Sequence, residues 1–478
     1  THGVVVEILN TAVERALDPD FALERSLALA DGVDVVAMDL HWYLHSFSVM
    51  ETARQIKAAN PEVRVLLGGY TATCFAQEIL RDHPDVDAVI VGEGELPLLR
   101  YVEAVRGKGR LEDVPNLAHR VDGRPGLSGT RWAASPEELA GFNFADLSLL
   151  RNAGTYLKLC TGSPTITYAN SPTPAEHLFY MCSGRGCTME CPHCGGTGSF
   201  ARTAMGQRAA CLRSAAAVLG EYEQLLGQGV SNFYFEYDPY PASGEYYRQL
   251  FDAMARGGAR PGINFGAWTL PGRELVASLA RAVSPRHSSI CVSPDTGSPG
   301  LRRRIKGGPP YENKQLEAWC LEVKQSGILP TVAFTMGLPF ETAHDFEQTL
   351  ALIRRLKRTG AQVVAGSYKL EPGSPIYRDP GRFGVTPYRR CFEDYYQHTR
   401  ALALGQPTPH PLGYRTAAFT ERQILELQFR ALRACYLSPG FLLRKAAQGG
   451  PSSGSGGVKM LGSMLTGSHA LLQRAMRE

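Results

Sequence analysis

Short apolar runs that alternate with amphipathic stretches constrain the fold of this chain more than any other feature of its sequence. Strands that are apolar on both faces and separated by helices are typical of a parallel, doubly wound sheet. We therefore expect a Rossmann-like α/β domain at residues 1–110. Its predicted strands lie at 4–9, 33–39, 63–67 and 88–91, and its predicted helices include 21–30 and 47–59, the latter ended by Asn60-Pro61.

A second series of strand and helix signals follows between residues 171 and 380. Six strand-like runs separated by helical stretches predict a partial (β/α)6 barrel, whose active site would lie at the carboxyl ends of the strands. The predicted strands are 177–182, 230–236, 262–268, 288–293, 330–336 and 362–370.

The segments outside these two regions carry weaker signals. Residues 111–170 are expected to form a connector, with two short strands around an Asp-Gly turn at 113–124 and a short helix at 142–150. Residues 381–478 are expected to form a helical C-terminal domain. Its predicted helices are 389–404 and 421–435, with a Ser/Gly linker at 451–457 and a last amphipathic piece at 458–477.

Polar and glycine-rich stretches follow three strands of the first region. They are Asp39-Leu-His41, Gly68-Gly-Tyr-Thr-Ala-Thr73 and Gly92-Glu-Gly-Glu95. Ligands of doubly wound sheets bind at the carboxyl ends of the strands, where these loops would converge. The alternative is that the glycines only form tight turns between strand and helix.

Three cysteines after the first strand of the barrel are spaced to bind one small inorganic cluster. Cys187, Cys191 and Cys194 lie in one short loop, and Gly195-Gly196 follows at once. A fourth ligand is missing from this loop, so a [4Fe–4S] cluster held here would keep one iron open for another ligand. Zinc is the alternative to an iron–sulfur cluster, but a structural zinc site normally takes four protein ligands in two pairs, and no second pair follows.

Composition narrows the classes of function. The net charge is +4 with Lys and Arg scattered, so neither nucleic acid nor an anionic membrane is an expected partner. No apolar run approaches the roughly 18 residues of a membrane span. Eleven irregularly spaced cysteines argue against a disulfide framework, and an oxygen-labile cluster suits a reducing cytoplasm.

The Cys-x3-Cys-x2-Cys loop, with the strand-like run that precedes it, resembles the radical SAM family. That resemblance implies that Cys187, Cys191 and Cys194 hold a [4Fe–4S] cluster and that S-adenosylmethionine (SAM) binds its open iron. Further stretches resemble the family's strand-end motifs in order: Glu236-Tyr-Asp238, Ser293-Pro-Asp295-Thr-Gly297, Gly337-Leu-Pro-Phe-Glu341 and Leu370-Glu-Pro-Gly-Ser-Pro375.

The same resemblance implies contacts with SAM at these strand ends. An acidic residue of the second strand would receive the amine, and an arginine of the run Arg302-Arg-Arg304 would receive the carboxylate. Spacing does not decide among the three arginines, and each motif singly can be read as a helix cap, a turn or a solvated face. The expected contacts are Gly195, Gly196, Glu236, Asp238, Ser293, Asp295, Arg303, Gly337 and Pro339.

Strands that end in Leu-Gly-Gly and then in Val-Gly-Glu-Gly-Glu resemble the cobalamin-binding domain fused ahead of many radical SAM domains. The resemblance covers about residues 1–110. Asp39-Leu-His41 lacks the glycine of the Asp-x-His-x-x-Gly pattern that supplies a histidine to cobalt, so we predict cobalamin without that ligand. The expected cobalamin contacts are His41, Gly68, Gly69, Thr71, Thr73, Gly92, Glu93 and Glu95.

Together the two resemblances imply a class B radical SAM methyltransferase. Such an enzyme would move a methyl group from SAM via methylcobalamin to a carbon of a small natural product or peptide. It would take electrons from a flavodoxin- or ferredoxin-type donor. The alternatives are a ring contraction or cyclisation without methyl transfer, and a cobalamin-binding sensor or carrier. The substrate and the catalytic residues stay unassigned.

Overall fold

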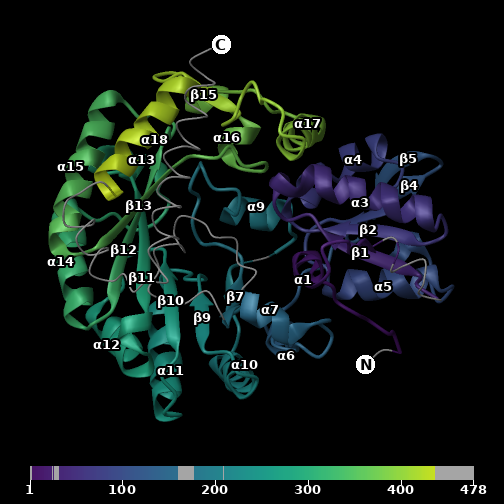
Figure 1. Ribbon diagram of the computed structural model, residues 1–478, viewed down its shortest axis with the longest axis horizontal. Helices are drawn as coiled ribbons and strands as arrows, with labels where there is room; N and C mark the ends of the chain where they lie inside the picture. The colour runs from purple at the N-terminus through teal and green to yellow at the C-terminus, as the bar shows by residue number, and fades with distance from the viewer. Residues whose placement is uncertain (1–2, 24, 26–31, 160–176, 208, 437–478) are drawn as a thin grey trace.

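The computed structural model describes residues 3–436 except 24, 26–31, 160–176 and 208, and Figure 1 shows its arrangement. The expected α/β architecture is confirmed, with a mixed five-stranded sheet and a separate parallel six-stranded sheet. The linker at 451–457, the last piece at 458–477 and most of the helix expected at 21–30 lie outside the described residues.

The first sheet has five strands in the order β1-β2-β3-β4-β5. β1 to β3 are parallel, whereas β4 pairs antiparallel with β3 and forms a hairpin with β5. In the turn between β4 and β5, Asp122 and Gly123 both have positive φ, as an Asp-Gly hairpin requires. The sheet thus continues into the segment expected as a connector. The strands are β1 (Val35–Asp39), β2 (Arg64–Gly68), β3 (Ala88–Ile90), β4 (Leu117–Val121) and β5 (Arg124–Leu127).

Helices cover both faces of this sheet (Figure 1). Val65 and Leu67 pack with the helices α3 and α4, whereas Leu66 points to the other face and packs with Tyr101 of α5. This alternation follows from the period of two along a strand. The helices are α3 (Ser46–Ala59), α4 (Tyr70–Asp82) and α5 (Glu95–Val105), preceded by α1 (Thr11–Leu17) and η1 (Tyr43–His45).

The strand expected at residues 4–9 does not form. Val5 is 96% exposed, and Ile8 makes only an isolated bridge to Leu150. The backbone groups of Ile8 pair with Leu149 and Arg151 instead of with the sheet, at 2.7 and 2.9 Å. An apolar run alone does not make a strand where another segment satisfies its hydrogen bonds.

The second sheet contains the six expected strands, all parallel, in the order β13-β12-β11-β10-β9-β6. β6 and β13 form its two edges, so the barrel is partial. The strands are β6 (Leu178–Tyr180), β9 (Asn232–Phe235), β10 (Gly262–Ala267), β11 (Ser289–Asp295), β12 (Leu329–Met336) and β13 (Gln362–Ser367).

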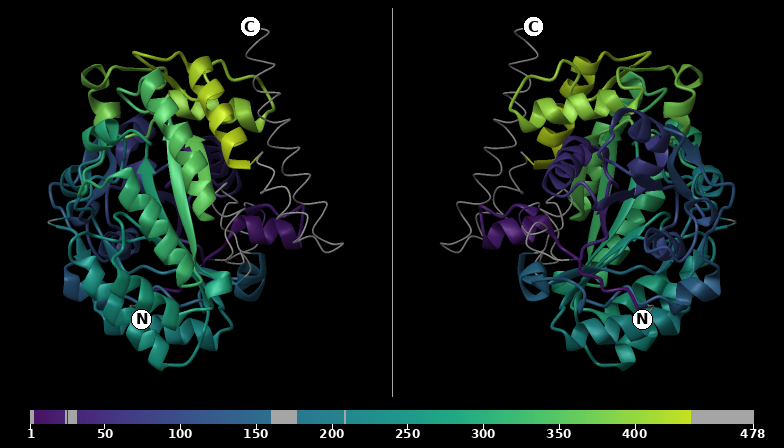
Figure 2. Two further views of the ribbon diagram at one scale, coloured as in Figure 1. Left: turned by 90° about the vertical axis from the view of Figure 1, so that its left-hand side faces the viewer. Right: turned by 90° about the vertical axis from the view of Figure 1, so that its right-hand side faces the viewer.

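Helices lie along the outer side of this curved sheet, as Figures 1 and 2 show. Their apolar faces bury a core rich in phenylalanine, including Phe233, Phe251 and Phe265. The carboxyl ends of the strands open on the inner side, toward the first sheet. The helices are α10 (Ala215–Gly227), α11 (Ser243–Arg256), α12 (Arg273–Ala282), α13 (Pro299–Ile305), α14 (Asn313–Gln325) and α15 (Ala343–Thr359).

The C-terminal helices connect the two sheets. α17 (Phe392–Ala403) buries Phe392 and Tyr395 in the core of the first domain, and α18 (Glu421–Tyr436) buries Ile424 in the barrel core. Both lie close to the helices expected from the sequence. The smaller elements here are α16 (Pro375–Arg378), η4 (Gly381–Phe383), β14 (Val385–Pro387) and β15 (Tyr414–Thr416).

The helix expected at residues 142–150 is absent from the described residues of that stretch. Asn143 and Asp146 accept hydrogen bonds from the backbone of Ala145 and Ser148, and such local turns compete with a helix. The helices α6 (Pro136–Gly141) and α7 (Ala153–Leu159) flank the stretch, and η2 (Leu111–Asp113) and η3 (Pro285–His287) lie elsewhere.

Candidate cofactor site

Each of the three clustered cysteines accepts a hydrogen bond from a backbone N–H. Met189 donates to Cys187 Sγ at 3.3 Å, Gly307 to Cys191 Sγ at 3.1 Å and Gly196 to Cys194 Sγ at 3.3 Å. The loop lies between β7 (Gly184–Arg185), which pairs with β8 (Cys211–Leu212), and α9 (Gly198–Thr203). Backbone donors aimed at sulfur favour the thiolate, which is the form that ligates iron.

Burial acts in the opposite direction on these thiols. It raises the pKa of Cys187 and Cys191, and it raises the pKa of Cys194 to about 12. Among the described residues, no three His, Cys, Asp or Glu side chains are placed to hold one metal ion. A four-iron cluster makes a different demand, because each sulfur then binds a different iron.

His193 lies between two of the cysteines but faces the barrel. Its Nε2 is 3.6 Å from Asp295 Oδ2, its Nδ1 has no partner, and burial lowers its pKa. It therefore lies against the end of β11, which agrees with leaving it out of the predicted ligands.

Gly195 and Gly196 are held by the last strand of the barrel and by the loop itself. Gly195 donates its N–H to Glu371 Oε2 at 3.0 Å, just after β13. Burial raises the pKa of Glu371. Glu371 lies in the strand-end motif Leu370 to Pro375 but was not among the predicted contacts, because its partner is 176 residues away.

The two acids after β9 have different surroundings. Asp238 is buried and accepts the backbone N–H of Trp268 at 2.7 Å, so it joins the ends of β9 and β10. Glu236 is exposed to the space at the strand ends but surrounded by protein on other sides, and desolvation raises its pKa. Of the two, Glu236 is the carboxylate open to a ligand.

A buried ion pair occupies the end of β11. Lys306 donates to Asp295 Oδ2 at 2.7 Å. Asp295 has a φ of 62°, which is uncommon for a residue other than glycine. Burial alone would lower the pKa of Lys306, but the charge of Asp295 reverses this effect and raises it. Ser293 is half-buried on the same strand. Lys306 was not among the predicted contacts, although it directly precedes Gly307, which donates its N–H to Cys191.

Arg303, the expected SAM contact of the arginine run, does not point into the site. Its guanidinium is exposed and pairs with the exposed Glu312 at 3.0 Å. Arg302 is buried and donates to the Thr296 and Tyr311 carbonyls and to Asn313. The helical period explains this, because neighbouring residues of α13 point in different directions. The structure therefore gives no support to Arg303 as a SAM contact.

Gly337 and Pro339 form a buried turn after β12. Gly337 has a φ of 75°, and its N–H donates to Glu341 Oε2 at 2.7 Å. Its carbonyl accepts the hydroxyl of Tyr414 at 3.0 Å, so the C-terminal segment covers this turn. Glu341 Oε1 has no partner, and burial raises the pKa of Glu341 to about 7.

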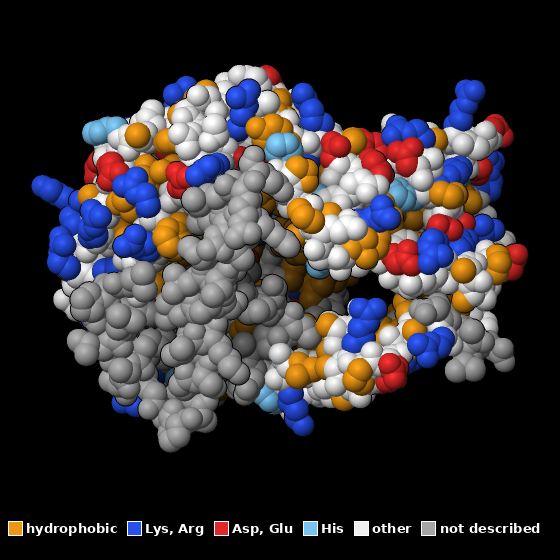
Figure 3. All heavy atoms as spheres, turned by 45° about the horizontal axis from the view of Figure 1, so that its top comes forward, with side chains coloured by type: hydrophobic (Ala, Val, Ile, Leu, Met, Phe, Trp, Pro, Cys, Tyr) orange, Lys and Arg blue, Asp and Glu red, His pale blue; other side chains and the backbone are white. Residues whose placement is uncertain are grey.

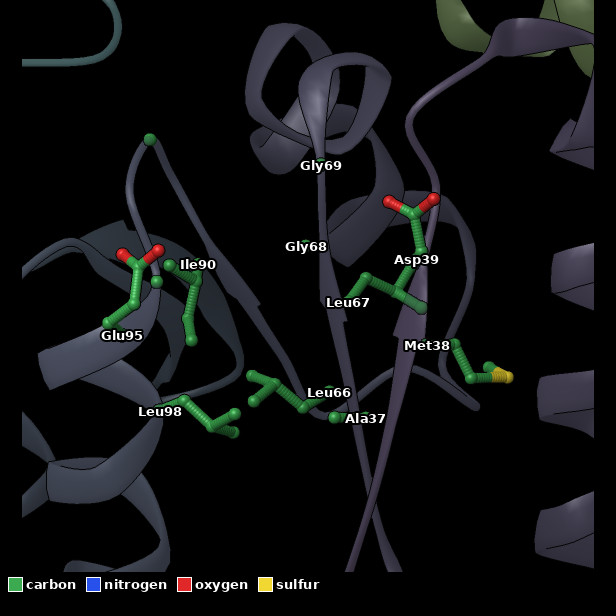
Figure 4. A pocket seen from close by; sticks show the side chains of 12 residues that line it. Ala37, Met38, Asp39, Leu66, Leu67, Gly68, Gly69, Ile90, Glu95 and Leu98 are labelled. Carbon is green, nitrogen blue, oxygen red and sulfur yellow. The ribbon is translucent and has the colours of Figure 1, made fainter. Parts of the chain in front are cut away.

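A cavity of about 360 Å³ opens at the strand ends of the first sheet, on the face covered by α5. Figure 4 shows apolar side chains along its wall and the carboxylates of Asp39 and Glu95 on either side of its upper end. A Cβ on Gly68 would meet no atom within 4 Å, whereas Gly69 has a φ of 98° and lies against Asp39. The cavity is thus an apolar slot with glycine at its rim.

The predicted polar contacts of this slot are largely engaged within the fold. Thr71 donates its hydroxyl to the His41 carbonyl at 2.8 Å, and Thr73 Oγ1 accepts the N–H of Gly92 at 3.0 Å. These bonds tie the three strand-end loops together. They use the hydroxyl hydrogen of Thr71, whereas Thr73 accepts and keeps its own O–H for another partner. The His41 side chain is exposed beside Tyr70.

Glu93 and Glu95 reach the cysteine loop of the other domain. Arg185 pairs with Glu93 at 3.1 Å and donates to Glu95 at 3.1 Å, two residues before Cys187. Glu93 also accepts from Gln207 at 2.7 Å. A Cβ on Gly92 would lie 3.0 Å from the Met205 carbonyl, so the loop packs closely on the barrel side. The strand ends of the two sheets therefore meet.

Comparisons with known families agree with this two-part site. Residues 1–102 match the family model of the B12 binding domain, and residues 181–353 match that of the radical SAM superfamily. The hopanoid C-3 methylase of Methylococcus capsulatus is 30% identical over 86 residues. That match covers 18% of this chain and 16% of the methylase.

Solved structures share the fold over most of the chain. The radical SAM methyltransferase TsrM from Kitasatospora setae, with tryptophan and a SAM analogue bound, has a TM-score of 0.57 and 16% identity, covering 78% of this chain and 71% of TsrM. The cobalamin-dependent radical enzyme OxsB, with aqua-cobalamin and SAM bound, has a TM-score of 0.59 and 12% identity. It covers 85% of this chain and 59% of OxsB.

Proposed function

The chain carries a B12-binding domain followed by a radical SAM domain, and we propose from this that it is a cobalamin-dependent radical SAM methyltransferase. Its substrate is a small molecule or a peptide, and the methyl group of SAM goes to one of its carbon atoms. The observation that carries the proposal is the meeting of the two strand-end loops, at Arg185 with Glu93 and Glu95. A cofactor held in each domain would face the same space.

The residues present fit a cluster and a corrin. Three thiolates with one backbone donor each suit a [4Fe–4S] cluster at Cys187, Cys191 and Cys194. The apolar slot beside Gly68 suits the nucleotide tail of cobalamin, because no protein atom lies within 4 Å of the position that a Cβ on Gly68 would take. When bound, the cluster supplies the electron that cleaves SAM, and cobalamin carries a methyl group.

The side chains at the strand ends bind and orient SAM. Glu236 offers a carboxylate to the methionine ammonium, since Asp238 is already bonded to the end of β10. Lys306 and Asp295 form a fixed ion pair beside Cys191 and His193, which holds this wall in place. Figure 3 shows a hollow between the barrel and the first domain with hydrophobic side chains at its wall, which suits a partly apolar substrate and limits water.

The proposal extends to the setting of the reaction. A flavodoxin- or ferredoxin-type donor supplies electrons, and a reducing cytoplasm preserves the cluster. Within the described residues, no helix has both the length and the apolar composition to cross a membrane.

The test is anaerobic reconstitution with iron, sulfide, cobalamin, SAM and reductant. The loaded protein is incubated with extracts of a strain that lacks the gene, and products are searched for a mass gain of one methylene. Cys191→Ala is the control that lacks cluster chemistry. SAM cleavage with no methylated product would contradict methyl transfer and leave ring contraction or cyclisation. Absence of a four-iron cluster would instead favour a cobalamin-binding sensor or carrier.

A further inference from the structure

Tyr70 extends from the B12-binding domain to the cysteine loop. It is the first residue of α4 and follows Gly69, whose positive φ turns the chain sharply at the end of β2. Its hydroxyl donates to the carbonyl of Pro372, after β13, and its ring packs on that of Phe200 with centroids 4.8 Å apart. One side chain thus contacts α9 and the last strand end of the barrel.

Two glycines mark how closely the barrel approaches this hydroxyl. A Cβ on Gly195, the residue after Cys194, would overlap Tyr70 Oη and lie 2.9 Å from Glu371 Oε2. A Cβ on Gly373 would lie 2.8 Å from Tyr70 Oη. The hydroxyl therefore sits between the cysteine loop and the turn after β13, where neither backbone has room for a side chain.

We propose that Tyr70 is a positioning residue that couples the cobalamin site to the cluster site. The turn at Gly68-Gly69 forms the rim of the cobalamin slot. The next residue, Tyr70, packs closely against Gly195 beside Cys194 and bonds to the turn after β13. A displacement of either loop would therefore change this contact. Arg185 and Gln207 join the domains through Glu93 and Glu95, and Tyr70 makes a separate contact at the other side of the cysteine loop. The inference rests on the proposed function for the identity of the two cofactors.

Tyr70→Phe tests this role, because it removes the hydroxyl and keeps the ring on Phe200. Tyr101→Phe is the matched control, since Tyr101 is buried in the core of the same domain among Leu66, Ile90 and Leu117. Hydrogen–deuterium exchange is measured on the full chain without cofactors. In Tyr70→Phe, peptides covering 194–201 and 371–376 should exchange on the order of fivefold faster, as loss of one hydrogen bond predicts. Peptides of β2 and β3 should be unchanged, as should all four regions in Tyr101→Phe.

A second readout uses the loaded protein. Pulsed electron paramagnetic resonance between reduced cluster and cob(II)alamin should give a broader distance distribution in Tyr70→Phe than in Tyr101→Phe. Unchanged exchange in both barrel peptides would overturn the proposal even if both cofactors bind and methyl transfer occurs. Failure of the wild-type chain to bind either cofactor would instead overturn the proposed function, and faster exchange would still support the link between the loops.

Discussion

The backbone N–H of Gly195 donates to the carboxylate of Glu371 at 3.0 Å, and this bond ties the cysteine loop to the last strand of the barrel. Gly195 directly follows Cys194, so the bond fixes the third sulfur relative to the sheet. Gly307, just after α13, donates its N–H to Cys191 Sγ, and the preceding Lys306 pairs with Asp295 at the end of β11. The loop is thus held from the ends of β11 and β13, which lie on either side of β12 in the sheet.

Glu371→Ala should lower the iron content of the reconstituted protein. It leaves the N–H of Gly195 without its buried acceptor, at a local cost of about 1–3 kcal/mol. Glu371→Gln keeps an acceptor oxygen and should retain most of the cluster. Iron analysis and the visible absorption of the cluster measure this, with exposed Glu393→Ala on α17 as control. Equal iron content in Glu371→Ala and the control would contradict the assignment.

Arg302 and Arg303 provide a matched pair of substitutions. Arg302→Met should destabilise the protein by about 2–4 kcal/mol, because three buried acceptors lose their donor. Arg303→Ala should change stability by less than about 0.5 kcal/mol and leave SAM affinity unchanged, since its ion pair is exposed. Denaturant unfolding and equilibrium dialysis with SAM measure the two effects. A loss of SAM binding in Arg303→Ala would restore the original prediction.

Lys306→Gln should lower the reduction potential of the cluster. The ammonium group opposes the effect of burial on the pKa of Cys191, and the same positive charge stabilises an added electron. Lys306→Arg keeps the charge and should shift the potential less. An anaerobic redox titration followed by electron paramagnetic resonance gives the midpoint, with exposed Lys314→Gln as control. A potential in Lys306→Gln at or above that of the control would exclude this effect.

Glu341 should make stability fall as pH rises. Burial raises its pKa from 4.5 to about 7, so the folded state binds the proton more tightly than the unfolded state. Stability from this group is complete below pH 4.5 and is lost as pH rises toward 7, by about 3 kcal/mol in total. Glu341→Gln should remove this loss, while Glu393→Gln should keep it. Thermal midpoints from pH 5 to 8 measure it, and identical pH profiles for Glu341→Gln and the wild type would contradict it.

Local sequence predicted the elements that depend on periodicity and close spacing. The six strands of the barrel, the Asp-Gly hairpin and the two C-terminal helices all formed where apolar pattern and turn residues agreed. The strand expected at 4–9 did not form, because residues 149–151 satisfy the backbone of Ile8. The helix expected at 142–150 did not form, because the side chains of Asn143 and Asp146 accept hydrogen bonds from the backbone nearby.

The site could be predicted less well than the fold, because long-range hydrogen bonds decide which polar groups stay free. Thr71, an expected cobalamin contact, donates its hydroxyl to the His41 carbonyl, and Thr73, another expected contact, accepts the N–H of Gly92. Tyr70 and Glu371 lie in the quoted motifs, but their importance comes from partners that the linear sequence does not place beside them. Whether the remaining predicted contacts bind SAM and cobalamin stays a prediction.

The central claim is methyl transfer that requires both cofactors, and SAM with a trideuterated methyl group tests it most directly. The reconstituted chain is incubated with cobalamin, labelled SAM and reductant, and the product is analysed by mass spectrometry. We expect a product that carries the deuterated methyl group on carbon. This product should be absent with Cys191→Ala and absent without cobalamin. A product formed at the expense of labelled SAM but free of deuterated methyl would contradict it.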